Sequence, residues 1–233
     1  MKKTLYMLFI VPVCILSMLS IIYLASKKEP LFFLQNVKIN GTSQLNDKEI
    51  MGKVSPYLKE SLLSIDVAKI KDTIAANPLV KDVRIKRIYP FSIVIDVKEK
   101  IPSAIWVNQE GDPYVLDEYG DPYRKLSKGE NKGLYIINAT EKSDAKSLFK
   151  EINGWMAEGI LKKEKISEAV YHEGNVTIFG YEDPIEIVLG KEEQKKRLQR
   201  AMTVLEDAHK RGLVIKCIDA RFEKGAIIQE RKG

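Results

Sequence analysis

The chain has 233 residues, of which 45% are hydrophobic and 30% charged, and its formal net charge is +6. This composition is ordinary for folded protein, and because no dense stripe of arginine and lysine is interleaved with aromatics, nucleic acid is not an expected target. Cys14 lies in an apolar N-terminal run and Cys217 in a predicted strand, so we expect no disulfide.

The first predicted element is an apolar helix over residues 5–25, a run without any charged side chain. Such a helix is about 30 Å long, which matches the hydrocarbon core of a bilayer. We therefore expect a single transmembrane helix, with residues 1–4 as a cytoplasmic tail and the rest exported. A cleaved signal peptide is the alternative, but its apolar region is shorter, and the residues around Ala25 lack a small-x-small cleavage site. Lysines flank both ends, so charge bias orients the helix only weakly.

The next stretch predicts a small domain with the order β-α-α-β-β. A strand over 32–41 stops at an Asn-Gly pair. A first helix follows with Asn46 as N-cap and Glu49 three residues on, an arrangement typical of a capping box. A second helix begins near Asp66 and ends before Asn77, and two alternating strands then close the unit.

The second half of the chain predicts a β-rich domain. Two Gly-Asp-Pro-Tyr turns, at 111–114 and 120–123, enclose a short strand and indicate a meander. The remaining predicted elements are a helix from Ser143, strands over 167–172, 175–180 and 185–189, a long helix over 191–211, and a terminal hairpin of 214–222 and 226–230.

Few residues point to catalysis. His172 and His209 belong to no cluster with metal-ligand spacing, and no nucleophile, phosphate-binding or dinucleotide motif occurs. The acids Asp112, Asp117 and Asp121 lack the alternate spacing and the closing Glu of a calcium loop, so turn chemistry is the favoured interpretation. We expect no metal, no cofactor and no small-molecule substrate. A pair of acids serving a membrane-anchored cell-wall hydrolase remains the alternative.

Short segments in both halves carry a family resemblance. The segments Val37–Gly41, Asn77–Val83, Arg87–Pro90 and Glu99–Trp106 resemble the POTRA domain of the bacterial FtsQ/DivIB cell-division family. Leu79 departs from the pattern, since the family usually carries Trp there, and Leu fills the same apolar slot.

The resemblance continues more loosely in the second half. It is carried there by Gln194–Arg200 and Ile218–Ala226, whereas residues 126–165 hold no matching motif. The implied architecture is α+β: a transmembrane helix, a POTRA domain over 31–100, and an FtsQ-type β domain over 101–233 with a long helix and a C-terminal hairpin.

The resemblance also implies a function. Members of this family are non-catalytic scaffolds of the inner membrane at the division septum, with the N-terminus cytoplasmic and the body periplasmic. They recruit FtsB and FtsL type membrane proteins and other divisome proteins, and a partner strand adds beside the last strand. The family's contact positions fall here on Phe222, Lys224, Gly225 and Ala226, and on Arg197 in the long helix.

Physical chemistry supports this surface but leaves alternatives open. A final strand with no chain after it presents an exposed edge, and Phe222 offers an apolar anchor. Arg197 offers a cation to a partner carboxylate. Phe222 would equally suit inward packing, and Arg197 a solvated helix face.

Overall fold

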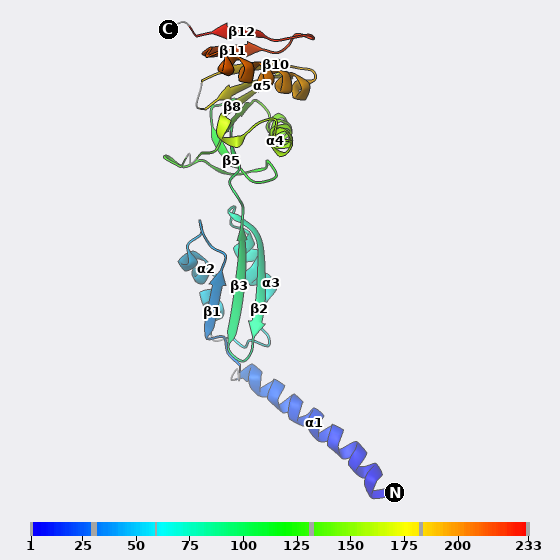
Figure 1. The fold of residues 1–233 in the computed structure, drawn as a ribbon. Helices are drawn as coiled ribbons and strands as arrows, with labels where there is room; N and C mark the ends of the chain where they lie inside the picture. The colour runs from blue at the N-terminus through cyan, green and yellow to red at the C-terminus, as the bar shows by residue number, and fades with distance from the viewer. Residues whose placement is uncertain (1, 29–31, 59, 131–132, 182–183, 232–233) are drawn as a thin grey trace. The chain divides into compact units, whose positions relative to one another are not determined.

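The computed structural model describes the whole chain apart from residues 1, 29–31, 59, 131–132, 182–183 and 232–233, and in the N-terminal helix it describes the side chains of residues 10–24. The chain divides into two compact units, Met1–Lys100 and Ile101–Gly233. Figure 1 shows the elements of each. Both units combine sheets with helices, which confirms the expected α+β class.

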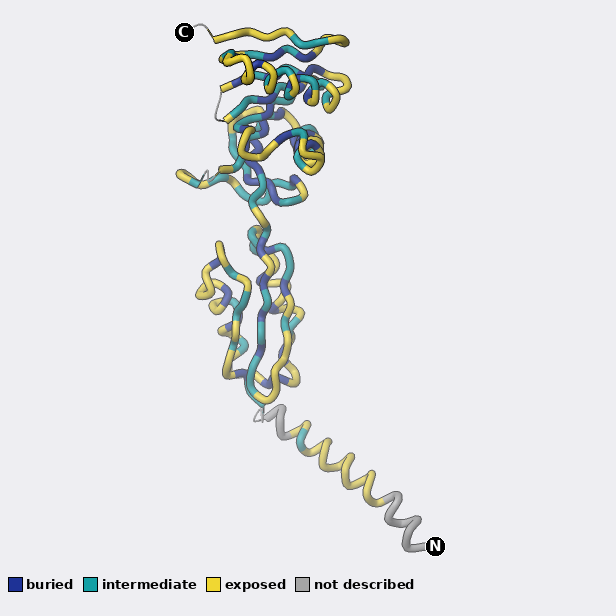
Figure 2. Tube along the Cα trace, in the orientation of Figure 1, coloured by how far each residue is buried: buried dark blue, intermediate teal, exposed yellow. Residues whose placement is uncertain are grey.

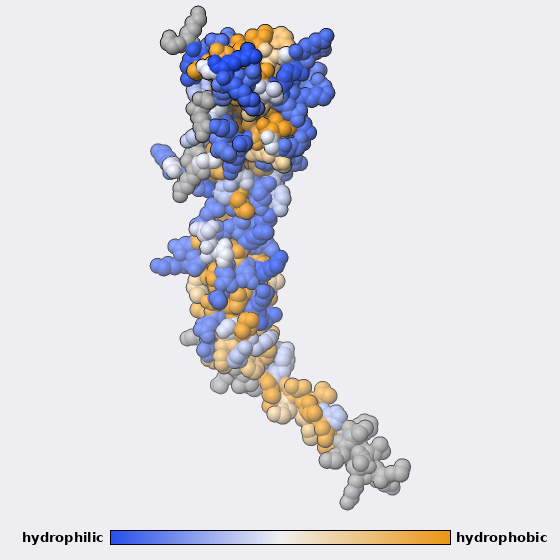
Figure 3. Space-filling model, in the orientation of Figure 1, coloured by the Kyte–Doolittle hydropathy of each residue, from blue (hydrophilic) through white to orange (hydrophobic). Residues whose placement is uncertain are grey.

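The N-terminal segment forms α1, a helix over Lys2–Lys28 with Pro12 inside it. Figure 3 shows its described part as a band of apolar side chains, and nearly all of them are exposed. Among the described residues, none of the helices combines the length and the apolar character that a membrane crossing requires. The crossing expected over 5–25 is thus unconfirmed and stays a prediction.

The rest of the first unit follows the predicted order β-α-α-β-β. Its elements are β1 (Asn36–Asn40), α2 (Asp47–Val54) with a 3-10 turn at Ser55–Tyr57, α3 (Val67–Ala75), β2 (Val80–Ile88) and β3 (Ser92–Glu99). The sheet order is β1-β3-β2, with β1 parallel and β2 antiparallel to β3. The core between sheet and helices includes Ile50, Ile70, Ile74, Val83, Ile93 and Ile95.

Local signals explain most of these boundaries. The Asn46 side chain accepts a hydrogen bond from the Lys48 amide at 2.9 Å and caps α2. Among the described contacts, Glu49 does not complete the expected capping box, and its Oε1 accepts from the Asn77 side chain at 2.9 Å. Strand β1 ends before Gly41, whose φ of +84° few other residues adopt.

One buried carboxylate holds the loop between β1 and α2 to the sheet. Glu99, which is 8% exposed at the end of β3, accepts from the amides of Ser43, Gln44 and Leu45 at 2.8 to 3.1 Å, and from the Ser43 hydroxyl at 2.7 Å. Burial alone would raise the pKa of Glu99, but these hydrogen bonds outweigh it, so the pKa lies below the usual glutamate value.

The second unit is built on one sheet of nine strands in the order β12-β11-β10-β9-β8-β7-β4-β5-β6. The strands are β4 (Ala104–Val107), β5 (Pro113–Leu116), β6 (Pro122–Lys125), β7 (Ile136–Ala139), β8 (Ile166–His172), β9 (Asn175–Gly180), β10 (Glu186–Gly190), β11 (Ile215–Asp219) and β12 (Ile227–Glu230). The meander and the terminal hairpin are confirmed. Strand β7, parallel to both β4 and β8, was not predicted.

Two long helices pack against the middle strands of the sheet. Helix α4 (Lys142–Ala157) lies against β7 and β8, and α5 (Gln194–Lys210) lies against β10 and β11. Figure 2 shows the buried stretches concentrated in the inner strands and on the helix sides that face them. The core residues include Leu148, Phe149, Ile152, Trp155, Leu198 and Ala201.

We predict that Glu99 makes the first unit acid-sensitive. Because its pKa is lower in the folded state, its contribution to stability is fully present above the unfolded value of about 4.3 and is lost as pH falls through the folded value. Glu99→Gln should lower the free energy of unfolding by about 1–3 kcal/mol at neutral pH, because the backbone amides of residues 43–45 lose a charged acceptor. Urea denaturation by circular dichroism at pH 7 and pH 4 should show a smaller pH effect in the variant; equal pH effects would contradict this role.

A second prediction concerns Tyr135. Its ring is 2% exposed, its hydroxyl has no hydrogen-bond partner among the described residues, and burial raises its pKa. Tyr135→Phe should leave stability unchanged or raise it by up to about 1 kcal/mol, because an orphan hydroxyl is removed without a cavity. Tyr135→Ala should cost about 3–5 kcal/mol. Tryptophan fluorescence in urea reports on the second unit, which holds Trp106 and Trp155. A large loss of stability in the Phe variant would show that the hydroxyl has a partner.

Candidate interaction surface at the last strand

Strand β12 is the end of the nine-stranded sheet. It pairs antiparallel with β11 through Ile218↔Ile228 and Asp219↔Ile227, and among the described residues no strand lies on its other side. Figure 1 shows it as the outermost strand of the second unit. One row of its backbone N–H and C=O groups is therefore available to a partner chain.

Apolar side chains of β12 are exposed on both faces. Ile227 is 57% and Ile228 36% exposed, although neighbours along a strand point to opposite faces. Helix α5 packs on β10 and β11, so its cover stops one strand short. Figure 3 shows apolar side chains among charged ones at this end of the unit. An exposed apolar edge of this kind is a template on which another chain can pair.

The opposite edge of the sheet has a different character. Strand β6 begins with Pro122, which has no N–H to donate, and it ends with Arg124 and Lys125. Arg124 forms an ion pair with Glu130, and Lys125 forms one with Asp112 at 2.9 Å. Proline and charge are the usual means of protecting an edge, so β12 is the less protected of the two edges of this sheet.

The four predicted contacts in the hairpin lie in the loop before β12. Phe222 is 47% exposed and Lys224 is exposed, while Gly225 and Ala226 are half-buried. Ala226 packs against the core of the unit. Inward packing of Phe222 is therefore not what the structure shows. The hairpin strands are shorter than predicted, so these residues form a loop rather than paired strand.

The predicted helix contact, Arg197, has a structural neighbour. Its Nη1 donates to the Leu189 carbonyl at 2.8 Å, which braces the start of α5 against the end of β10. The residue is half-buried rather than on a solvated face. Nothing in these contacts tests its predicted role in binding.

Arg200, which sequence reasoning missed, reaches the hairpin loop directly. Its Nη1 donates to the carbonyls of Phe222 and Gly225, the latter at 3.2 Å. One guanidinium thus ties the two ends of the exposed part of the loop to α5. The only sequence signal was a second arginine three residues after Arg197.

Charges at the end of β11 are paired within the chain. Arg221 forms a two-pronged ion pair with Asp219, with distances of 2.9 and 2.6 Å. The hydrogen bonds from Arg221 hold the pKa of Asp219 below its usual value. This pair is exposed, so it adds little stability but fixes the side chains beside the loop.

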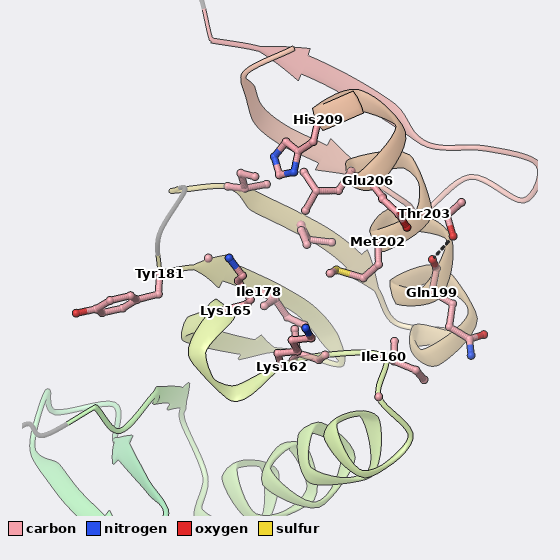
Figure 4. A pocket seen from close by; sticks show the side chains of 16 residues that line it. Ile160, Lys162, Lys165, Ile178, Tyr181, Gln199, Met202, Thr203, Glu206 and His209 are labelled. Atoms are coloured by element: carbon pink, nitrogen blue, oxygen red, sulfur yellow. Dashed lines mark hydrogen bonds between the residues drawn. The ribbon is translucent and has the colours of Figure 1, made fainter. Parts of the chain in front are cut away.

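A separate hollow of the unit lies on another side of α5. This cavity of about 660 Å³ opens between the helix and strands β9 and β10, and Figure 4 shows Met202 and Glu206 on its helix side. Glu206 is the one carboxyl among the described residues that line it, and it pairs with Lys210 at 2.8 Å, which lowers its pKa. A glycosidase needs two carboxyl groups across a cleft, one with a raised pKa. The described lining of this cavity has one carboxyl group, and its pKa is lowered.

The acids of the two turns bond to neighbouring groups of this chain. Asp117 is buried and accepts from the amides of Tyr119 and Asp121 at 2.9 and 3.0 Å, which confirms its predicted turn chemistry. Asp121 pairs with Lys146 at 2.6 Å, and this bond lowers its pKa. Within the described parts of the chain, no three His, Cys, Asp or Glu side chains are grouped to hold a metal.

Comparison with known proteins agrees with this architecture. Residues 32–100 match the family model of the FtsQ-type POTRA domain, and residues 104–221 match that of the FtsQ/DivIB C-terminal domain. The cell division protein FtsQ of Geotalea daltonii is 22% identical over 85% of this chain and 76% of its own length. For FtsQ of Hahella chejuensis the values are 24%, 82% and 66%.

The chain is also similar to a protein named DivIB. The cell division protein DivIB of Clostridium tetani is 23% identical over 54% of this chain and 48% of its own length. The two family models together cover the chain from the first aromatic of the POTRA unit to the loop of the terminal hairpin. The chain belongs to the FtsQ/DivIB family of cell-division proteins.

Proposed function

We propose that this chain is a non-catalytic scaffold of the division machinery, held in the inner membrane by residues 5–25, with its body in the periplasm at the septum. It recruits FtsB and FtsL type membrane proteins and other divisome proteins. The observation that carries this proposal is the open edge of β12, with Ile227 and Ile228 exposed beside it.

Recruitment proceeds by strand addition. An extended segment of the FtsB type protein, itself paired with an FtsL type protein, lies along β12 and bonds to its free N–H and C=O groups. The strand has four residues, and each backbone bond contributes about 0.5–1.5 kcal/mol net, so the edge alone gives modest affinity. Side chains must supply the rest. Phe222 is the largest exposed apolar group beside the edge and serves as the anchor.

The surrounding residues prepare this surface before the partner arrives. Arg200 holds the carbonyls of Phe222 and Gly225, so less loop entropy is lost on binding. Lys224, exposed on the same loop, attracts an acidic partner. Arg197 braces the helix that carries Arg200, in addition to its proposed contact with a partner carboxylate.

Membrane attachment increases the effect of a modest contact. Two tethered proteins share a thin layer, so their effective concentration exceeds that of free proteins without any new contact. The apolar helix α1 supports this attachment.

The first test is a pull-down of residues 27–233 with the extracytoplasmic parts of the organism's own FtsB and FtsL homologues. Phe222→Ala should weaken binding by about tenfold or more, which corresponds to about 1.4 kcal/mol or more. A chain ending after Glu223 should not bind. Tyr181→Ala is the matched control, because this aromatic is 72% exposed elsewhere on the same unit.

Circular dichroism must show that each variant is folded. Wild-type protein that fails to bind in any buffer would overturn the scaffold proposal. Equal losses for Phe222→Ala and Tyr181→Ala would place the contact away from β12.

The role of Arg200 is tested by hydrogen exchange. Arg200→Ala should speed exchange in the peptide that spans 220–228 and weaken partner binding, while global stability falls by no more than about 1 kcal/mol. Lys196→Ala, which removes an exposed ion pair with Glu193 one turn away, serves as the control. Unchanged exchange in the Arg200 variant would show that the loop is ordered without this contact.

A further inference from the structure

One end of the three-stranded unit carries a cluster of aromatic and apolar side chains. We call it the aromatic end and define it as Phe33, Leu63, Ile88, Tyr89 and Phe91. Three of these are well exposed: Leu63 at 44%, Ile88 at 49% and Tyr89 at 56%. Surface aromatics and aliphatics gathered in this way mark a contact surface.

Three segments that are distant in sequence build the aromatic end. The rings of Phe33 and Phe91 lie 5.9 Å apart. The amides of Gln35 and Asn36 both donate to the Phe91 carbonyl, at 2.9 and 3.1 Å, which joins the start of β1 to the β2–β3 turn. Arg87 brings in the third segment.

Arg87 Nη2 donates to the Ile65 carbonyl at 2.8 Å, so the loop that holds Leu63 is tied to the same turn. Figure 1 shows the β2–β3 turn and the start of β1 at one end of the sheet. The cluster is therefore a built surface and not a set of unrelated exposed side chains.

The covalent chain identifies what this surface meets. Only residues 26–35 separate the end of the apolar run, Ala25, from the first residue of β1, and they span at most about 35 Å when extended. Because Gln35 and Asn36 are bonded to the β2–β3 turn, the chain enters the unit at the aromatic end. A bilayer that holds the apolar run would consequently lie within reach of the aromatic end.

The chemistry of the aromatic end fits the headgroup layer of a bilayer. Tyrosine places an apolar ring at the acyl boundary and its hydroxyl among the headgroups. Charged side chains near this end have partners within the chain: Lys86 pairs with Asp96 at 3.4 Å, and the Asp66 carboxylate caps α3. Apolar insertion, rather than attraction to anionic lipid, therefore dominates.

We propose that the aromatic end of the first unit rests on the lipid surface, with Ile88 and Tyr89 at headgroup depth. This proposal depends on the membrane attachment proposed above. It gives this unit a fixed orientation relative to the bilayer.

The test uses the full chain in nanodiscs of phosphatidylcholine, with and without phosphatidylglycerol. With Cys14 and Cys217 replaced by Ala, single cysteines at Ile88→Cys and, as a control on the same sheet, Lys98→Cys carry an environment-sensitive dye. Lys98 is exposed near the other end of β3. The dye at 88 should shift to the blue and be quenched by lipids spin-labelled near the headgroup, with little dependence on phosphatidylglycerol.

A second probe avoids reliance on one substitution. A dye at Leu63→Cys should be quenched likewise, and the added changes Ile88→Ser and Tyr89→Ser should abolish that quenching. No quenching at 63 or 88 in a chain that resists carbonate extraction would overturn this proposal alone. A blue shift without quenching would mean that protein covers the patch, and equal quenching at 98 would show no fixed orientation. A chain that carbonate extracts would overturn the attachment itself.

Discussion

The constraint that shapes the second unit is the pairing of β11 with β12. This pairing leaves the last strand of a nine-stranded sheet bonded on one side only. An open sheet always has two edges, and this one treats them differently. Proline and paired charges protect β6, whereas β12 exposes Ile227 and Ile228. Natural edges are normally protected, so an unprotected edge that the neighbouring helix does not cover is open to pairing with another chain. The proposed function rests on this asymmetry.

The same logic extends from the strand to the loop before it. Cations near the hairpin could have been left free to attract a partner, but Arg200 and Arg197 are bonded to backbone carbonyls of this chain. Their role within the unit is to hold a loop and a helix in place. A partner that arrives at an ordered loop loses less conformational entropy than one that must order it. Preorganisation, rather than a large contact area, is what a four-residue edge needs.

In the first unit, a buried carboxylate holds a loop in place. Its buried carboxylate Glu99 gathers the amides of one loop at the end of β3, while the turn at the other end of that strand carries the aromatic cluster. Burying a charge is costly unless each lone pair is satisfied, so Glu99 stabilises the loop only because several donors converge on it. The result is a loop between β1 and α2 that is fixed to the sheet of the first unit.

Local signals in the sequence determined most of the elements. The capping side chains of Asn46 and Asp66 indicate where helices begin, and alternating apolar residues indicate β2 and β3. Both signals can be read from the sequence because caps and periodicity depend only on near neighbours. Strand β7 was missed because it is four residues long and its partners, β4 and β8, are far away in sequence. The sequence already indicated an edge at the last strand, but only the tertiary structure decided that α5 stops short of β12. It likewise decided that Arg200 reaches the loop, since packing of Leu198 and Ala201 sets the rotation of the helix.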